Sequence, residues 1–358
     1  MSNTLPLENK RVLVTGGTGS LGQVLVRRLL AAELGRPQQI VVLSRDEAKQ
    51  HEMRQQYLRR GVTTDEVIYR SFRETLSFRI GDVRDFHSVS SALRGIDVVF
   101  NAAALKQVPT CEYFPYEAVQ TNIGGAENIV RAVRELDLPV ETVIGISTDK
   151  ACKPVNVMGM TKAIQERVFV KANIDCPATR FVCVRYGNVL ASRGSVIPLF
   201  HQQIRSGGPV TLTTPEMTRF LLSLDDAVDT VFAALREALP GETYIPRAPT
   251  ARIVDLAAVL IGDRPIATTY IGIRPGEKTH EILISEEEAH RTVQRGAYYV
   301  IRPMLPELRD DSGTEPALAG EYSSAEGVMS RAALAALLRA RRLLVEDVEA
   351  QAGAELLR

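Results

Sequence analysis

The sequence predicts an α/β protein in which a doubly wound parallel sheet is followed by a smaller C-terminal lobe. In the first half, short and fully apolar runs recur, and segments with a helical apolar period separate them. Such alternation builds a parallel sheet with helices on both faces. In the second half the elements become shorter, and glycine and proline become more frequent, as in RSGGPV, TTPEMTRF and RAPTAR.

Each element of the expected sheet has its own signature. The strands are apolar runs rich in valine, isoleucine and phenylalanine, and the helices carry apolar residues on one face. Two stretches break the pattern: residues 59–76 are interpreted as a helical or loop insertion, and residues 306–327 as a polar loop. The expected strands cover residues 11–15, 40–44, 77–80, 97–101, 141–147 and 180–185, and the clearest helices cover 21–32, 126–136 and 331–344.

Composition excludes several classes of function. Among 358 residues the 43 basic side chains equal the 43 acidic ones, so nucleic acid and anionic membranes are not expected partners. The N-terminus lacks the apolar core of a signal peptide, and the apolar stretches are too short to span a bilayer. The four cysteines show no metal-ligand spacing, so no metal is expected, and they fit a reducing cytoplasm. Cys152 lies close to Asp149 and Lys150, but no histidine accompanies it, and a core thiol is the preferred interpretation.

A glycine-rich turn, VTGGTGSLG, follows the first expected strand and opens a helix. This context is typical of a dinucleotide-binding Rossmann sheet, in which glycines let the backbone approach a pyrophosphate at the helix N-terminus. With the change of rhythm after residue 187, we expect a dinucleotide-binding domain over 1–187. The remaining residues, 188–358, then form a substrate-binding lobe with a C-terminal tail, and interleaving of the two is left open. The cofactor-binding residues expected in the turn are Gly16, Thr18, Gly19, Ser20, Leu21 and Gly22.

The end of the second strand indicates which dinucleotide binds. A basic residue there accepts the 2′-phosphate of NADP, whereas an acidic one binds the ribose hydroxyls of NAD. Ser44 and Arg45 favour NADP, and Asp46 directly after them keeps NAD open. Further cofactor contacts are expected at Asp82 and Val83, beside the adenine, and at Ala102 and Ala103, which are small residues next to the cofactor.

The stretch STDKACKPVNVMGMTK, residues 147–162, has the form of an active-site segment with one unexpected residue. Lys162 stands where a Tyr-x-x-x-Lys pair places its lysine, but four residues earlier stands Met158. Both lie on one face of the expected helix. Since a thioether neither donates nor accepts a proton in catalysis, the proton chemistry must come from other residues.

These motifs together resemble the extended short-chain dehydrogenase/reductase family. Within it the chain is most similar to the inverting UDP-N-acetylglucosamine 4,6-dehydratases of capsule, O-antigen and flagellin-sugar pathways, including a subgroup with methionine in place of tyrosine. The resemblance covers roughly residues 10–305, and its greatest weight is on Lys150, where non-inverting dehydratases have glutamate. The matching motifs are VTGGTGSLG, SRDE, GDVRD, NAAALKQVP, TNIGGAEN, STDKA, NVMGMTK, RYGNVLASRGSVIPLF, MTRF and RPGEK.

The resemblance implies an internal redox cycle on a UDP-sugar. Hydride leaves C4, the C5 proton is removed, water leaves C6, and the same hydride returns to C6. Lys150 is then the base at C5 and Asp149 the acid at C6, while Thr148 bonds the C4 oxygen and Lys162 holds the nicotinamide ribose. We expect burial to favour the neutral form of both members of the pair, and the nicotinamide and Lys162 to lower the pKa of Lys150 further. Because neighbours on a strand point to opposite faces, the backbone must turn just after Ser147.

The resemblance also implies a homo-oligomer and a set of substrate-binding residues. Arginine suits a diphosphate because its guanidinium makes bidentate, charge-assisted bonds. Glu277 is equally well placed for a local ion pair with Lys278. The expected substrate-binding residues are Lys106, Met158, Asn188, Ser195, Val196, Pro198, Arg219, Arg274 and Glu277.

Two other functions remain open at this point. An NADP-dependent nucleotide-sugar 4-epimerase shares the fold and hydride removal at C4, but does not need an acid–base pair directed at C5 and C6. A non-catalytic NADP-sensing module would explain the missing tyrosine, but not the Asp149–Lys150 pair. The substituent at C2 of the sugar, the pathway, the oligomer size and an additional C3 epimerisation are not determined by the sequence.

Overall fold

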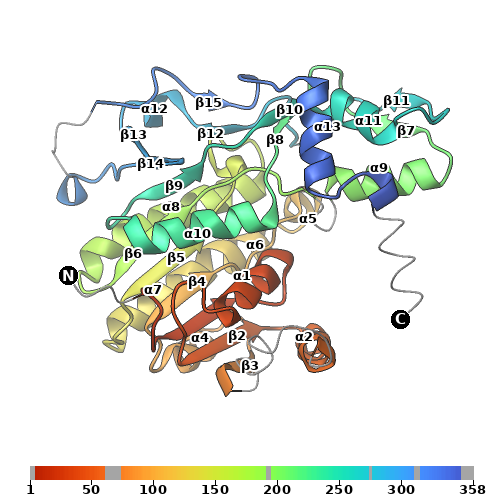
Figure 1. Cartoon of the computed structure of the whole chain (residues 1–358). Coiled ribbons are helices and arrows are strands. Elements are labelled where there is room, and N and C mark those ends of the chain that lie inside the picture. The colour runs from red at the N-terminus through yellow and green to blue at the C-terminus, as the bar shows by residue number, and fades with distance from the viewer. Residues whose placement is uncertain (1–4, 61–73, 191–194, 274–275, 310–314, 348–358) are drawn as a thin grey trace.

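A nine-stranded sheet forms the centre of the computed structural model, which describes residues 5–60, 74–190, 195–273, 276–309 and 315–347 (Figure 1). The strands, in spatial order, are β13 (Thr292–Arg295), β14 (Tyr298–Ile301), β9 (Thr243–Pro246), β6 (Arg180–Val184), β5 (Thr142–Ile146), β4 (Val98–Asn101), β1 (Arg11–Thr15), β2 (Gln39–Ser44) and β3 (Leu76–Ile80).

The predicted doubly wound arrangement is confirmed. The strands β1 to β6 coincide with the expected runs to within one residue at each end, and they pair in parallel. Strand order reverses at β1, which lies between β2 and β4. β9 continues the parallel run beside β6, whereas the β13–β14 hairpin completes that edge in antiparallel fashion. Since β9, β13 and β14 come from beyond residue 187, the sheet draws on both halves of the chain.

Helices cover both faces of the sheet because successive strand residues point to opposite sides. Leu13 belongs to one apolar core and its neighbour Val14 to the other. One face is covered by α1 (Ser20–Leu30), α2 (Glu47–Arg60) and α10 (Leu224–Glu237), and the other by α4 (Phe86–Leu93), α7 (Gly125–Glu135) and α8 (Val157–Asp175).

A smaller lobe follows β6 and lies beyond one end of the sheet (Figure 1). One apolar core of the lobe is separate from the two cores of the sheet, and a further cluster joins Phe220, Leu283 and Ile284 of the lobe to Ile245 and Ile301 of the sheet. The lobe contains the helices α9 (Val196–Arg205), α11 (Ile253–Ile261), α12 (Glu286–Ala289) and α13 (Arg331–Ala340), and the strand pairs β7 (Val210–Leu212) with β11 (Thr268–Tyr270), β8 (Thr218–Phe220) with β10 (Thr250–Arg252), and β12 (Ile282–Ile284) with β15 (Tyr322–Ser323).

Two expectations about irregular stretches have different outcomes. The prediction of a loop over 306–327 is wrong at β15, which pairs with β12. The centroid of the Tyr322 ring lies 5.0 Å from that of Phe220 and 5.1 Å from that of Tyr299, and this packing holds the segment in place. Of the insertion at 59–76, residues 61–73 lie outside the described residues. Within the described ranges, no helix is long and apolar enough to cross a bilayer.

Candidate active site

The glycine turn between β1 and α1 has the shape that a pyrophosphate requires. Gly16 has φ +67°, and a Cβ there would lie 2.8 Å from the Cα of Ala103. A Cβ on Gly22 would lie 2.5 Å from the Cα of Gly17, so side chains are excluded on both sides of the turn. Gly19 caps α1 without a side-chain hydrogen bond, which leaves the first amides of the helix to a ligand. The turn therefore fits a dinucleotide.

The remaining expected cofactor residues surround this turn. Thr18 and Ser44 are joined by a hydrogen bond of 2.9 Å between their hydroxyls, which ties the turn to the end of β2. Ser20 and Leu21 are the first two residues of α1. Ala102 follows β4 and donates its backbone N–H to the carbonyl of Thr15. Val83 is buried after β3, and its backbone carbonyl accepts a hydrogen bond from the side-chain amide of Asn128.

The two charged residues after β2, Arg45 and Asp46, have different partners. Asp46 accepts from the backbone N–H of Lys49 and pairs with the Lys49 ammonium at 2.8 Å, and these bonds lower the pKa of Asp46. Asp46 is thereby engaged by α2. Arg45 keeps a side chain that is 53% exposed, 3.7 Å from the Asp82 carboxylate, so the structure brings these two expected cofactor residues together.

The expected acid–base pair lies at the carboxyl end of β5, where the chain turns. β5 ends at Ile146, and a short 3₁₀ helix, η2 (Asp149–Ala151), begins three residues later, which confirms the expected turn. The turn lets Lys150 Nζ approach Asp149 Oδ1 to 3.1 Å, and Thr148 Oγ1 donates to the same oxygen at 2.7 Å. Lys150 Nζ also donates to Asn188 Oδ1 at 3.0 Å. Four expected site residues thus form one hydrogen-bonded group.

The electrostatic setting of Lys150 differs from the expectation. Burial alone would lower the pKa of Lys150, but the carboxylates of Asp149 and Glu281 outweigh it and raise the pKa above its usual value. The cation that opposes them is Arg219 rather than Lys162. The predicted lowering of the Lys150 pKa is therefore wrong for the protein without ligands, in which Lys150 is a charged ammonium held between carboxylates.

Helix α8 places Met158 in an apolar environment, and the absence of a role for it in proton chemistry stays a prediction. Met158 is 4% exposed and packs in a small apolar cluster with Cys111 and Ala118. Lys162, one turn further on, is also buried and donates to Gln165 Oε1 at 2.5 Å. Burial lowers the pKa of Lys162 to about 8.

Gly159 in the same helix has a role that the sequence did not reveal. A Cβ on Gly159 would press into the carbonyl group of Lys150, with the carbonyl carbon only 2.9 Å away and the oxygen closer still. The absence of a side chain lets α8 pack directly on η2. One helix therefore positions both Lys162 and the backbone of Lys150.

A buried ion network holds the β5 end against the C-terminal lobe. Arg185 makes paired hydrogen bonds to Glu166 and to Glu288, all at 2.7 to 3.0 Å. Glu166 also accepts from the Ser147 hydroxyl at 2.5 Å. Although burial would raise the pKa of Glu288, Arg185 lowers it to about 2, so both partners stay charged. The network fixes the residue at which the chain turns toward η2.

The C-terminal lobe contributes two charged residues that the sequence analysis did not assign to the acid–base group. Glu281 is 3% exposed, and its carboxylate lies 3.4 Å from Lys150 Nζ. Lys278 donates to the backbone carbonyl of Cys152 at 2.7 Å, and burial lowers its pKa. Lys278 is the last residue of RPGEK, a motif noted for its arginine and glutamate, and Glu281 follows three positions later; no periodicity distinguishes either residue.

The expected substrate residues are placed less uniformly. Arg219 is buried and donates to the backbone carbonyls of Thr218, Lys278 and Thr279, so it is not a solvated surface charge. Ser195 precedes α9, and its buried hydroxyl has no protein partner among the described residues. Val196 and Pro198 lie in the first turn of α9, Lys106 is exposed after β4, Glu277 is half-buried, and Arg274 lies outside the described residues.

The cysteines behave as core thiols. All four are buried and free. Burial raises the pKa of Cys152 to about 12, which leaves it protonated at neutral pH and unsuited to act as a nucleophile.

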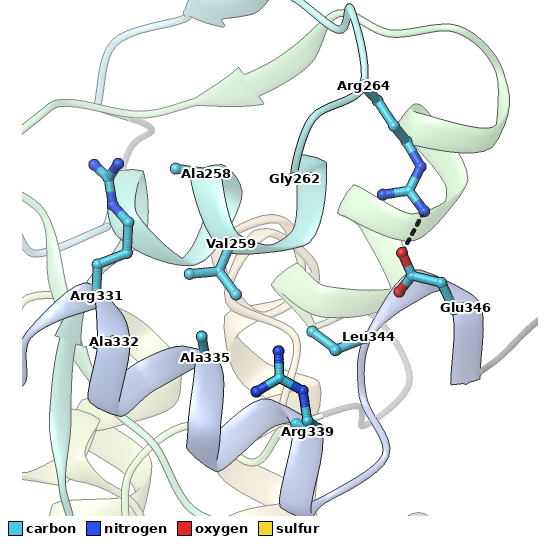
Figure 2. A pocket seen from close by; sticks show the side chains of 10 residues that line it. All are labelled: Ala258, Val259, Gly262, Arg264, Arg331, Ala332, Ala335, Arg339, Leu344 and Glu346. Atoms are coloured by element: carbon cyan, nitrogen blue, oxygen red, sulfur yellow. Dashed lines mark hydrogen bonds and ion pairs between the residues drawn. The ribbon is translucent and has the colours of Figure 1, made fainter.

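A pocket of about 430 Å³ lies elsewhere, between α11 and α13 (Figure 2). Its floor is apolar, with Val259 and Leu344, and Arg264 at its rim bonds Glu346 at 2.7 Å. None of the expected cofactor, substrate or acid–base residues lines it. The acid–base group at the β5 end, and not this pocket, is therefore the candidate active site.

Comparison with known proteins shows the family to which the chain belongs. The family model described as "Polysaccharide biosynthesis protein" matches residues 12–303. A Rickettsia typhi protein named UDP-glucose 4-epimerase is 43% identical over 298 residues, covering 82% of this chain and 83% of its own. The X-ray structure of Pen from Bacillus thuringiensis has a TM-score of 0.83 at 33% identity and covers 94% of this chain and 99% of its own. The dTDP-glucose 4,6-dehydratase DesIV from Streptomyces venezuelae has a TM-score of 0.61 at 21% identity, covering 75% and 86% respectively, and shares the fold.

The fold and the glycine turn define a Rossmann-type protein whose fold matches that of solved nucleotide-sugar enzymes. Within this class the chain belongs to the polysaccharide biosynthesis protein family, whose relatives are nucleotide-sugar dehydratases and epimerases.

Proposed function

We propose that the protein is a UDP-N-acetylglucosamine 4,6-dehydratase that inverts C5. The observation that carries this proposal is the buried group at the end of β5, where Asp149 and Lys150 lie 3.1 Å apart. A dehydratase must remove a proton from carbon and protonate a leaving hydroxyl, which requires two different groups near one sugar. A carboxyl group and an amine in direct contact provide such a pair.

In this proposal each residue has a defined task. Lys150, once deprotonated, takes the C5 proton, and Asp149, once protonated, gives a proton to the C6 hydroxyl as it leaves as water. Thr148 donates to the C4 oxygen. Lys162 binds the nicotinamide ribose, and Met158 closes the site without exchanging protons.

The cofactor that the glycine turn fits is proposed to be NADP. When bound, it supplies a site that accepts the C4 hydride and later returns it to C6. Arg45 would bind the 2′-phosphate, since Asp46 is engaged by α2. The turn at Gly16 would hold the pyrophosphate, with Asp82 near the adenine. The UDP moiety would contact Asn188, the start of α9 and the loop that contains Glu277.

A second candidate, an NADP-dependent nucleotide-sugar 4-epimerase, is favoured by the names of the Rickettsia relatives. An epimerase acts at C4 alone and has no need of a base for C5. The second carboxylate at Lys150, from Glu281, adds to the machinery beyond what that reaction requires.

One NMR experiment separates the candidates. Purified protein is incubated with UDP-N-acetylglucosamine in heavy water, and the sugar is followed by ¹H and ¹³C spectra. We expect a C5-inverted, L-configured 4-keto-6-deoxy sugar still attached to UDP, with deuterium at C5 and the original C4 hydrogen in the C6 methyl group. A product with retained C5 would contradict inversion. An epimeric hexose without loss of water would establish the epimerase.

Variants test the assignment of the base. Lys150→Ala should abolish elimination while UDP and NADP still bind. Lys171→Ala, which removes an exposed lysine of α8, is the matched control and should leave turnover unchanged. Full elimination by Lys150→Ala would show that another residue removes the C5 proton.

We further propose that the protein works as a cytoplasmic homo-oligomer. Exposed aromatic side chains gather on the short helices α5 (Val108–Tyr113) and α6 (Pro115–Ala118), where Tyr113 and Tyr116 are 83% and 69% exposed. Exposed apolar clusters of this kind mark association surfaces. Sedimentation of the wild type and of Tyr116→Glu should show an assembly that weakens in the variant, and a monomeric wild type would contradict the proposal.

A further inference from the structure

Glu281 lies immediately before β12 and is held firmly from both sides. Its backbone N–H donates to the Ser324 hydroxyl at 2.9 Å, and the Ser324 N–H donates back to the Glu281 carbonyl at 2.8 Å. The Ser324 hydroxyl is in turn 2.8 Å from that of Thr218 in β8. The position of the Glu281 backbone is therefore determined by the C-terminal lobe.

The Glu281 carboxylate points at the acid–base group. Oε1 lies 3.4 Å from Lys150 Nζ and 3.6 Å from Arg219 Nε. The other oxygen, Oε2, is buried and has no hydrogen-bond partner in the described structure, and the same holds for Oδ2 of Asp149. Two carboxylates from different parts of the chain thus flank one ammonium, and each keeps one oxygen unused in a place from which solvent is largely excluded. Buried polar atoms without partners are rare and mark sites where a ligand or a reaction uses them.

We propose that Glu281 is a positioning residue of the acid–base site, whose carboxylate shares the Lys150 ammonium with Asp149 and thereby fixes its direction and its charge. The inference rests on the proposed function, because that function gives Lys150 its role as the base at C5. Asp149 and Asn188 each hold the ammonium by one hydrogen bond, and the Glu281 carboxylate adds a second negative charge from a separate element that restricts its orientation further.

The four charged groups that face Lys150 come from three parts of the chain. Asp149 precedes it in η2, Glu281 stands before β12, Arg219 lies in β8, and Lys278 lies in the loop that precedes Glu281. The two cations oppose the two carboxylates. Removing the charge of Glu281 should therefore leave Lys150 with an excess of nearby positive charge and make it lose its proton more readily.

The test uses Glu281→Gln, which keeps the shape and removes the charge, and Glu281→Asp, which keeps the charge and withdraws it by one methylene. The reactivity of Lys150 is measured directly, by trace labelling with acetic anhydride at pH 9 and mass spectrometry, with exposed Lys171 as the internal standard. Only the neutral amine reacts, so a fall of one unit in the Lys150 pKa raises its labelling about tenfold. We expect such a rise in Glu281→Gln and a clearly smaller one in Glu281→Asp.

Turnover provides the second readout. The acidic limb of the pH profile of kcat should move to lower pH in Glu281→Gln by about one unit, and Glu281→Asp should restore much of the wild-type profile. Glu321→Gln is the matched control. Glu321 lies in the same lobe as Glu281, but its carboxylate pairs with Lys153 at 2.9 Å, so this substitution should change neither readout.

The outcomes separate the inference from the proposed function. Unchanged labelling of Lys150 in Glu281→Gln would overturn the inference, as would a pH profile that stays in place while labelling rises. If the wild type forms no dehydrated product, the proposed function fails before any variant is made, and the labelling result still decides whether Glu281 controls Lys150. If Glu281→Gln does not fold, the comparison of Glu281→Asp with wild type decides in the same way.

Discussion

Replacement of Gly159 by alanine is the sharpest test of how α8 positions the acid–base group. Real Cβ atoms essentially never come closer than 3.0 Å to another heavy atom, and a Cβ on Gly159 would lie much closer than that to the carbonyl oxygen of Lys150. Backbone lies on both sides of this contact, so η2 or the start of α8 must move by roughly 1 Å. A misplacement of this size costs about 10²-fold in rate, or about 2.7 kcal/mol in the barrier.

Stability should change much less than turnover in this variant. Alanine in place of glycine favours a helix by about 1 kcal/mol, which partly offsets the local overpacking of about 1–3 kcal/mol. The assay therefore measures kcat for the dehydrated sugar together with the thermal unfolding midpoint. We expect kcat to fall about 100-fold with a small change in the midpoint.

Gly124→Ala is the matched control for Gly159→Ala. Gly124 has helical backbone angles, and a Cβ there would have only the Val119 carbonyl oxygen in contact, at 3.9 Å. Its kcat should equal that of the wild type. If Gly159→Ala also keeps kcat within about twofold of the wild type, the packing of α8 does not set the geometry of Lys150 and the reasoning is refuted.

Three further predictions concern single side chains. Arg45→Ala should raise the Kd for NADP about tenfold or more and leave that for NAD nearly unchanged, as measured by calorimetry; equal losses would remove the 2′-phosphate assignment. Met158→Leu conserves volume and should keep most turnover, whereas Lys162→Met should lose it, and a collapse in Met158→Leu with intact folding would mean that the thioether has a task. The buried Lys162, with a pKa of about 8 in the folded state and about 10.4 when unfolded, opposes folding while it is charged. The free energy of unfolding should therefore rise between about pH 8 and pH 10.4 as the folded protein releases this proton first, and urea titrations of Lys162→Met should show a smaller rise over the same window.

The sequence was sufficient for the strands β1 to β6 and for one side of the site, but not for β9, β13 and β14. Apolar runs locate β1 to β6 because parallel strands are buried on both faces, and the Asp149–Lys150 neighbours needed only a turn after Ser147 to meet. Glu281 was not predictable in the same way, because it lies 131 positions after Lys150 and reaches it only through the packing of β12 on β15. The pKa of Lys150 was predicted in the wrong direction for the same reason: its second carboxylate comes from a distant part of the chain.

The ion network around Arg185 also has a consequence for how the protein is made. Arg185 and Glu166 emerge from the ribosome close together, but Glu288 follows about a hundred residues later. Until then the Arg185 guanidinium bonds only one of its two carboxylate partners. Domains usually fold as units during synthesis, yet here the N-terminal portion cannot complete this hydrogen-bond network on its own. We therefore expect the turn at Ser147 to reach its final place only after α12 has been added.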